Sequence, residues 1–461
     1  MKNNWSGKRV LIIGAARQGL ALARFLANRG ATVTLNDQRS HSELASEIES
    51  LKETGVKWSL GNHEVNLLEK VDTISLSGGI PLNLPILQQA NHQEIPLTND
   101  AQIFLEEVKA QVIGITGSAG KTTTTTLVGR MAIAAVPHTR RVWVGGNIGN
   151  PLISDLDNIQ PDDLVVMELS SFQLDQMTIS PRVACVLNIT PNHLDRHGTM
   201  QSYVAAKARL LDFQNPNDIV ILNREDRGSW DLVPRVKGKL VSFGVKEPEN
   251  GLDGTYVDGE TIMLRHGSET TTIMPVSNIK LRGTHNLMNV LAACAIAHAS
   301  GFPIQAMSDA LIGFAGVPHR LEFIASHKGA DWYNDSIATA PERTMAAIHA
   351  FKEPLVLLLG GRDKKLPWED LAKLIHHRVD HLVVFGELAP LVLAAVGSAK
   401  AGHRPYSITQ SKNLQQAVQA ADDVASTGDV VLLSPGGTSF DEFKDFEERG
   451  ECFRTFVRQL S

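Results

Sequence analysis

Short apolar runs recur along this chain, and each is followed by a glycine-containing or polar turn and then by a segment with a helical pattern. Residues 9–13 form the first run, and the turn 14–19 follows it. A second run at 31–35 leads to Asp37, and a third at 73–76 enters another glycine turn. Strands and helices that alternate in this way predict a parallel sheet covered by helices.

The same alternation continues through the middle of the chain, from residue 112 to about 315. Apolar strand patterns occupy 112–115, 164–167 and 185–189. Several Gly and Asp turns with short alternating runs over 223–275 indicate a β-rich excursion. We therefore predict a second parallel sheet, covered on both faces, with a β-rich insertion.

A third α/β region follows a linker near 316–318. Its strand patterns lie at 355–359, 382–385 and 430–433, and the last of them ends in a Ser-Pro-Gly-Gly turn. The chain length allows about three domains that each bury a core. The predicted α/β fold has a Rossmann-like N-terminal domain (1–104), a central P-loop ATPase-like parallel sheet (105–316) and a C-terminal Rossmann-like domain (317–461).

Composition narrows the classes of function. The 461 residues are 43% hydrophobic and 20% charged, ordinary values for a globular protein. A formal net charge of −6 without a dense Lys/Arg stripe argues against nucleic acid as a partner. No run of about 18 apolar residues occurs, so no membrane span is expected.

The cysteines and the N-terminus indicate the compartment. Cys185, Cys294 and Cys452 are odd in number and far apart, which predicts free thiols in a reducing cytoplasm. The polar start of the chain leads directly into the first strand, and this argues against a signal peptide. We expect a cytoplasmic protein.

A glycine-rich turn after the strand 112–115 predicts a nucleotide site. The turn ends in Lys121-Thr122 and opens a Thr-rich helical segment, so backbone N–H groups and the helix N-terminus can face phosphates. Ile115 stands where the common spacing has a glycine, and a plain Gly/Thr turn is the alternative. The predicted ATP-binding residues here are Thr116, Gly117, Ser118, Ala119, Gly120, Lys121, Thr122 and Thr123.

Charged residues at strand ends are candidate metal ligands. Glu168 ends the strand 164–167 and would lie opposite Thr122, where it could bind Mg²⁺. A helix-capping glutamate is the alternative. His193 follows the strand pattern 185–189, although a structural histidine would look the same.

The first domain has features of a dinucleotide fold. Asp37 falls where such folds place an acid that binds ribose, but Ala16 replaces the middle glycine of the fingerprint. We therefore predict a nucleotide or sugar nucleotide at these strand ends. A nicotinamide dehydrogenase is a disfavoured alternative.

Taken in order, these segments resemble the Mur ligases over essentially the whole chain. The family marks are the loop 116–122, the block 192–195, His285-Asn286, and His319-Arg320 before Glu322. Segments 146–149, 168–174 and 434–450 are most similar to the members that add D-glutamate. The Asp-Asn-Pro-Arg signature of the diamino-acid-adding member is absent.

The resemblance implies an ATP-dependent ligase of peptidoglycan synthesis. ATP would phosphorylate the carboxylate of UDP-N-acetylmuramoyl-L-alanine, and the amine of D-glutamate would then attack the acyl phosphate to give a tetrahedral intermediate. Lys121, Glu168, His193 and Lys207 would be the catalytic residues. The ligands of two Mg²⁺ ions would be Thr122, Glu168, His193 and Lys207, the last as a carbamate. The resemblance further implies a monomer.

Lys207 has two opposed interpretations. It lies in a helical stretch, 201–207, where a lysine is usually solvated on the surface. The family's Tyr-x-x-x-Lys segment, matched here from Tyr203 to Lys207, implies instead a lysine that CO₂ converts to an anionic carbamate beside Mg²⁺.

The resemblance also assigns the remaining contacts. ATP would meet Asn286, Asn289, Arg320 and Asp335. The UDP-sugar would meet Arg17, Gln18, Asp37, Arg39, Ser77 and Gly79. Asn147 would contact the sugar nucleotide or the reacting groups, and His193 would also contact substrate. D-glutamate would bind Thr339 and Lys364 by one carboxylate, and Ser439, Phe440 and Phe446 by the other.

Three positions depart from the family pattern. Ile337 stands where many of these ligases have lysine, residues 16–18 alter the uridine loop, and the turn 77–79 lacks a proline. Three alternatives remain open: a Mur ligase for another amino acid, a folate-type glutamate ligase, and a non-catalytic ATP-dependent regulator.

Overall fold

The computed structural model describes residues 4–281, 283–364 and 366–460, and leaves out the side chain of Asp195. The chain forms two compact units. Unit 1 comprises residues 1–279 and 284–313, and unit 2 comprises 280–283 and 314–461. No described helix has both the length and the apolar character needed to cross a bilayer.

The first sheet of unit 1 has five parallel strands in the order β3-β2-β1-β4-β5. Helix α1 packs Leu22 and Leu26 on one face, and α3 packs Ile86 and Leu87 on the other. The elements are β1 (Arg9–Ile13), α1 (Arg17–Asn28), β2 (Thr32–Asp37), α2 (Ala45–Leu51), β3 (Lys57–Leu60), β4 (Thr73–Leu76), α3 (Pro85–His92), β5 (Leu97–Thr98) and α4 (Asp100–Glu107).

The second sheet of unit 1 has nine strands in the order β14-β13-β12-β11-β10-β9-β6-β8-β7. All neighbours from β7 to β12 are parallel, whereas β12, β13 and β14 pair antiparallel. These are β6 (Gln111–Thr116), β7 (Val142–Gly146), β8 (Leu164–Glu168), β9 (Val183–Val186), β10 (Ile219–Asn223), β11 (Lys239–Phe243), β12 (Asp253–Asp258), β13 (Thr261–His266) and β14 (Glu269–Pro275).

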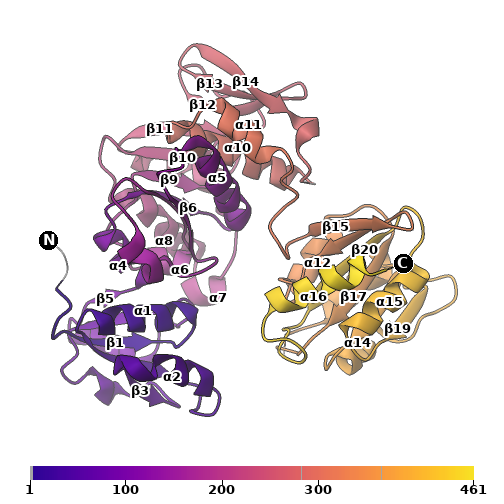
Figure 1. Cartoon of the computed structure of the whole chain (residues 1–461), viewed down its shortest axis with the longest axis horizontal. Coiled ribbons are helices and arrows are strands. Elements are labelled where there is room, and N and C mark those ends of the chain that lie inside the picture. The colour runs from indigo at the N-terminus through magenta and orange to yellow at the C-terminus, as the bar shows by residue number, and fades with distance from the viewer. Residues whose placement is uncertain (1–3, 282, 365, 461) are drawn as a thin grey trace. The chain divides into compact units, whose positions relative to one another are not determined.

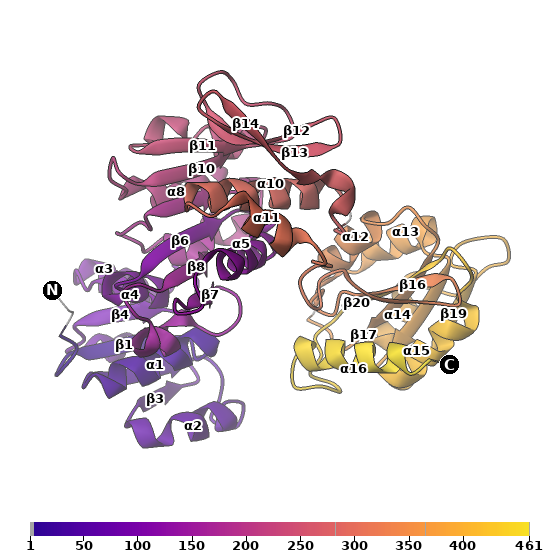
Figure 2. The same cartoon turned by 45° about the horizontal axis from the view of Figure 1, so that its top comes forward.

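The predicted β-rich excursion is therefore confirmed as the antiparallel end of this sheet, which Figures 1 and 2 show at the end of unit 1 opposite the first sheet. Helices α5, α10 and α11 pack together beside it, and α6 contacts α8. The helices are α5 (Lys121–Ala135), α6 (Ser171–Leu174), α7 (Leu194–His197), α8 (Met200–Asp212), α9 (Arg227–Trp230), α10 (Thr284–Ala299) and α11 (Ile304–Leu311).

The two sheets of unit 1 share one hydrophobic cluster. Phe25 of α1 and Phe104 of α4 belong to the same cluster as Leu152 of the 3-10 helix η3 (Leu152–Asn158) and Leu174 of α6. Burying large apolar side chains from both sheets in one cluster joins the sheets by the hydrophobic effect.

Unit 2 has a six-stranded sheet in the order β15-β16-β20-β17-β18-β19, antiparallel only between β15 and β16. Helices α12, α13 and α14 contribute to one core cluster, and α15 and α16 to the other. The elements are β15 (Glu322–His327), β16 (Ala330–Asn334), α12 (Pro341–His349), β17 (Leu355–Gly360), α13 (Glu369–Arg378), β18 (His381–Phe385), α14 (Ala389–Val396), β19 (Ser407–Gln410), α15 (Leu414–Val424), β20 (Val430–Gly436) and α16 (Phe446–Arg458).

Asn99 is one of the residues that link the two sheets of unit 1 by polar contacts. The buried Asn99 side chain caps α4 by accepting from Gln102 N at 2.8 Å, and its Nδ2 donates to Gln173 O at 2.7 Å. We predict that Asn99→Ala lowers the free energy of unfolding by about 2 kcal/mol, because a cap and a buried hydrogen bond are both lost.

Thr199→Ala is the matched control for urea unfolding, since the exposed Thr199 caps α8 by accepting from Ser202 N at 3.1 Å and bonds otherwise to the exposed hydroxyl of Ser202 at 3.0 Å. Its expected cost is about 1 kcal/mol. Equal costs for the two variants would contradict a linking role of Asn99.

Candidate active site

The glycine-rich turn at residues 116–122, which we call the phosphate-type loop, has the predicted strand-turn-helix geometry. Strand β6 ends at Thr116, and α5 begins at Lys121. Gly120 has φ +83°, and a Cβ there would lie 2.2 Å from Asn289 Oδ1, so the turn requires glycine. Lys121 Nζ donates to Gly117 O at 2.9 Å and thus lies over the loop that it is expected to serve.

Asn188 holds this loop from the neighbouring strand end. Its backbone O accepts from Ser118 N at 2.9 Å, and its side chain bonds Ala119 N at 2.8 Å and Ala119 O at 3.1 Å. The sequence predicted a strand over 185–189, whereas β9 (Val183–Val186) ends three residues earlier and Asn188 faces the loop. The sequence prediction did not identify this role of Asn188.

Glu168 lies at the end of β8 beside the loop. Its buried carboxylate accepts from Thr122 Oγ1 at 3.0 Å and from Asn147 Nδ2 at 2.8 Å. The helix-capping alternative is wrong, because α6 is capped by Ser170 and Gln173. A buried carboxylate beside a threonine hydroxyl offers the hard oxygen donors that Mg²⁺ prefers.

Lys207 is buried, with 1% of its surface exposed, so the surface-lysine interpretation is wrong. Its Nζ lies 3.3 Å from Thr116 Oγ1 and 4.9 Å from the Tyr203 ring centroid. Within the described part of the chain, no carboxylate oxygen lies within 4.0 Å of this amine. Burial and the charge of Lys121 hold the pKa of Lys207 well below its usual value, against the attraction of Glu168.

His193 belongs to an aromatic cluster next to α8. Its ring centroid lies 5.0 Å from that of Phe172, which stacks on His197 at 5.5 Å. His197 in turn lies 5.1 Å from Tyr203, whose hydroxyl bonds Ser118 Oγ at 2.9 Å. The cluster therefore connects the 168–174 segment to the phosphate-type loop.

Asn286 and Asn289 lie three residues apart on one face of α10. Asn289 Nδ2 donates to Asn286 Oδ1 at 3.1 Å, and Thr124 Oγ1 lies 3.5 Å from Asn289 Oδ1. Because Asn289 also lies against Gly120, α10 contributes polar groups directly to the phosphate-type loop.

The strand ends of the first sheet form a tight turn. Asp37 accepts from Ala15 N at 2.7 Å and pairs with Arg39 at 3.0 Å, and these bonds lower its pKa to about 2. Ser77 Oγ donates to Gly14 O at 2.7 Å. Asp37 thus fixes this turn through its bonds to Ala15 N and to Arg39. The remaining predicted UDP-sugar residues of this sheet, Arg17, Gln18 and Gly79, are exposed or half-buried.

Unit 2 contains the other predicted site residues. Buried Asp335 accepts from Ser434 Oγ at 2.9 Å and Leu321 N at 3.2 Å, and burial raises its pKa to about 7. Lys364 Nζ donates to Thr339 Oγ1 at 3.0 Å. Ser439 is buried and Phe440 is exposed, and the Phe446 ring centroid lies 6.2 Å from that of His319.

Arg449 is a further buried cation, and in the sequence it stands out only as part of the segment 434–450. Its guanidinium donates to Ser336 Oγ and O and to Gly437 O at 2.9–3.2 Å. It lies close enough to Lys364 to lower the pKa of that lysine. Arg449 therefore fixes the strand ends on which Ser439 and Ser336 lie.

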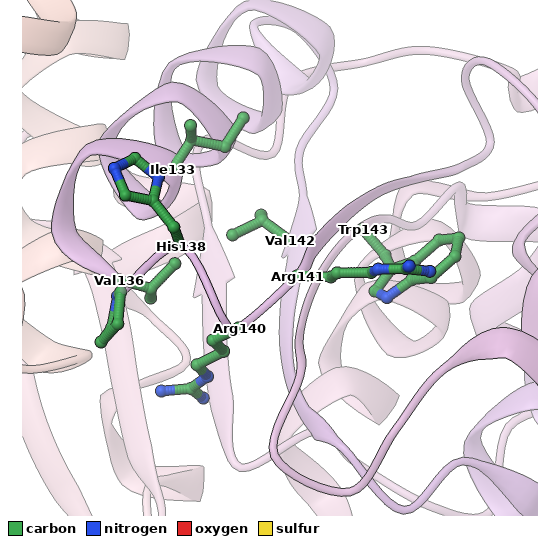
Figure 3. Close-up of a pocket in the computed structure, with 8 residues that line it drawn as sticks. Ile133, Val136, His138, Arg140, Arg141, Val142 and Trp143 are labelled. Atoms are coloured by element: carbon green, nitrogen blue, oxygen red, sulfur yellow. The ribbon is translucent and has the colours of Figure 1, made fainter.

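A pocket of about 370 Å³ lies at the opposite end of α5 from the phosphate-type loop (Figure 3). Since α5 has 15 residues, the two places are about 20 Å apart along the helix. None of the predicted site residues lines it. The lining residues are Ile133, Val136, Pro137, His138, Arg140, Arg141, Val142 and Trp143.

Solved structures share this fold. MurF from Acinetobacter baumannii has a TM-score of 0.57 at 19% identity, with 97% of this chain and 94% of that chain covered. UDP-N-acetylmuramate-alanine ligase MurC from Thermotoga maritima has a TM-score of 0.56 at 18% identity, with 98% and 99% covered.

Family models match along the chain: Mur ligase MurD-like, N-terminal domain at 8–99, Mur ligase middle domain at 115–297, and Mur ligase, glutamate ligase domain at 319–437. The UDP-N-acetylmuramoylalanine--D-glutamate ligase of Symbiobacterium thermophilum is 38% identical over 454 residues, 98% of each chain. That of Pelotomaculum thermopropionicum is 38% identical over 461 residues, 100% of this chain and 99% of its own. Similarity of this extent shows that the chain belongs to the Mur ligase family.

Proposed function

We propose that this protein is an ATP-dependent ligase that joins D-glutamate to UDP-N-acetylmuramoyl-L-alanine, with release of ADP and phosphate, in peptidoglycan precursor synthesis. The strongest support is the 38% identity, over 98% of both chains, to the UDP-N-acetylmuramoylalanine--D-glutamate ligase of Symbiobacterium thermophilum. The buried Glu168 and Lys207 and the half-buried Thr122 beside the phosphate-type loop are consistent with this chemistry.

The reaction requires activation of a carboxylate, which is a poor electrophile. Transfer of the γ-phosphoryl group of ATP to the L-alanyl carboxylate forms an acyl phosphate and releases ADP. The amine of D-glutamate attacks its carbonyl carbon, and the tetrahedral intermediate expels phosphate to leave the amide. The protein must hold the anionic reactants together and offset their charge, and Lys121 over the loop is placed for the ATP phosphates.

The residues around Glu168 suit Mg²⁺. Thr122 and Glu168 would hold one ion, and we assign a second to His193 and a carbamate of Lys207, with Glu168 near both. Bound Mg²⁺ would neutralise phosphate charge during phosphoryl transfer. Asn147 fixes one oxygen of Glu168 and leaves the other to the Thr122 side.

Lys207 is suited to carbamate formation because its buried amine favours the neutral form. The nitrogen lone pair of a neutral amine attacks CO₂, an N–C bond forms, and one proton is released. The product is anionic, which suits a place where the positive charge of Lys121 disfavours an ammonium.

The other assignments follow the family pattern. Asn286, Asn289, Arg320 and Asp335 would contact ATP. The strand ends of the first sheet, with Arg17, Gln18, Asp37, Arg39, Ser77 and Gly79, would contact the UDP group, and the bonds of Asp37 to Ala15 N and Arg39 would hold this turn in place.

D-glutamate would meet Lys364 and Thr339 by one carboxylate and Ser439, Phe440 and Phe446 by the other. The 3.0 Å bond between Lys364 and Thr339 supports their common use. We further propose a cytoplasmic monomer, since a nucleotide-linked substrate and unpaired cysteines suit that compartment.

The first prediction concerns the amino acid. With ATP, Mg²⁺ and UDP-N-acetylmuramoyl-L-alanine, we expect phosphate release to require D-glutamate and to be absent with L-glutamate or without an amino acid. Release with a different amino acid would refute the D-glutamate assignment. ATP binding without turnover for any amino acid would favour a regulator.

The second prediction concerns Lys207. Lys207→Arg keeps a basic side chain but cannot form the carbamate, so we expect kcat to fall by about 100-fold or more, as when one stabilising group of a transition state is removed. The exposed Lys52→Arg, 58% accessible and paired with Glu49, is the control and should remain active. Near-normal turnover of Lys207→Arg would exclude Lys207 from the mechanism.

Lys207→Met tests the charge state by stability. The pKa of Lys207 is lowered in the folded protein, so between that value and the ordinary 10.5 the unfolded chain binds more protons. Wild-type stability should therefore rise with pH across this window, and Lys207→Met should lose this contribution. Identical pH dependence of the two urea midpoints would contradict a neutral amine.

A further inference from the structure

Two cations of unit 2 lie at the segment 337–339, next to the buried Asp335. Lys364 Nζ donates to Thr339 Oγ1 at 3.0 Å, and Arg343 Nη1 donates to Ile337 O at 3.3 Å. Burial and the charges of Arg343 and Arg449 lower the pKa of Lys364, while Arg320 and Arg343 oppose the burial that raises the pKa of Asp335. The family resemblance implies that Arg320 contacts ATP and that Lys364 contacts D-glutamate, and it gives no role to Arg343.

The backbone fixes the position of Arg343. It lies in the first turn of α12, which begins with Pro341 and is tied to β20 by a 3.1 Å bond from Thr344 Oγ1 to Ser434 O. Arg343 Nη1 donates to Ile337 O at 3.3 Å, and the same carbonyl accepts from Thr339 N at 2.9 Å. The guanidinium is therefore held at the segment 337–339.

Arg343 and Lys364 form no close ion pair among the described residues, although Asp335 and Glu342 attract Arg343 from a longer distance. No carboxylate oxygen of the described residues lies within 4.0 Å of the Arg343 guanidinium or of Lys364 Nζ. Arg449 differs, because backbone carbonyls of Ser336 and Gly437 accept its hydrogen bonds. Partial loss of hydration and the positive charge of Arg320 lower the pKa of Arg343, although the residue remains exposed to solvent. Two cations at one segment that no described carboxylate contacts within 4.0 Å can attract an anionic ligand.

We propose that Arg343 binds a carboxylate of the incoming amino acid together with Lys364 and Thr339. This inference rests on the proposed function and deepens it by adding a residue that recognises the acidic substrate. Ile337 cannot supply a cation at its own position, and Arg343 reaches the same segment from the first turn of α12. A planar guanidinium can bind a carboxylate by two parallel hydrogen bonds.

Kinetics of Arg343→Met test the assignment. Loss of a charge-assisted hydrogen bond should raise the KM for D-glutamate about 10- to 100-fold. The KM for ATP and the melting temperature should stay unchanged. Lys373→Met is the matched control, because Lys373 is 73% exposed, lies on α13 of the same unit and pairs only with Asp370 at 3.0 Å.

A second variant separates loss of charge from loss of shape. Ile337→Lys combined with Arg343→Met places a cation back at the segment 337–339, and it should recover much of the affinity for D-glutamate. An unchanged KM for D-glutamate in Arg343→Met, or a rise confined to the KM for ATP, would overturn the proposal. If wild-type turnover requires another acidic amino acid, the same comparison with that amino acid tests Arg343 separately from the D-glutamate assignment.

Discussion

The buried amine of Lys207, which has no carboxylate oxygen of the described residues within 4.0 Å, is the constraint on which the site in unit 1 depends. Lys207 is 1% exposed, and its nearest polar contact is the hydroxyl of Thr116 at 3.3 Å. An isolated charge in such a place is costly, so the neutral form is favoured. Lys121 adds positive charge on the same side. The region therefore favours anions: phosphates over the loop, and a modification that reverses the sign of Lys207.

The parallel sheet brings these groups together. Strands β6, β8 and β9 end at the same edge, so Thr116, Glu168 and the turn after Val186 meet although they are far apart in sequence. Asn188 fixes the loop backbone and Asn147 fixes Glu168. Their bonds set the geometry before any ligand arrives, which is the form of preorganisation that electrostatic catalysis needs.

Local sequence signals predicted the elements that depend on neighbouring residues. The strand-turn-helix at 112–122, the position of Glu168 at a strand end and the shared helix face of Asn286 and Asn289 follow from short-range patterns. Features that depend on tertiary contacts could not be predicted from such patterns. The burial of Lys207 arises because α8 packs on the sheet, and a helical pattern alone does not reveal which face is covered.

In unit 2, too, the position of a key side chain depends on tertiary contacts that short sequence patterns do not reveal. The motif at 434–450 indicated a functional segment, but the position of Arg343 depends on the bond of its side chain to Ile337 O and on the tie between α12 and β20. The sequence shows that Ile337 departs from the family pattern. It does not reveal that Arg343 can supply the missing positive charge, because Arg343 matches no motif.

Carbon-13 NMR with labelled bicarbonate tests the central claim about Lys207 most directly. The account predicts a carbamate signal at near-neutral pH in the wild-type protein that disappears in Lys207→Met. A wild-type spectrum without any labelled carbonyl on the protein, or a signal that persists in the variant, would contradict it.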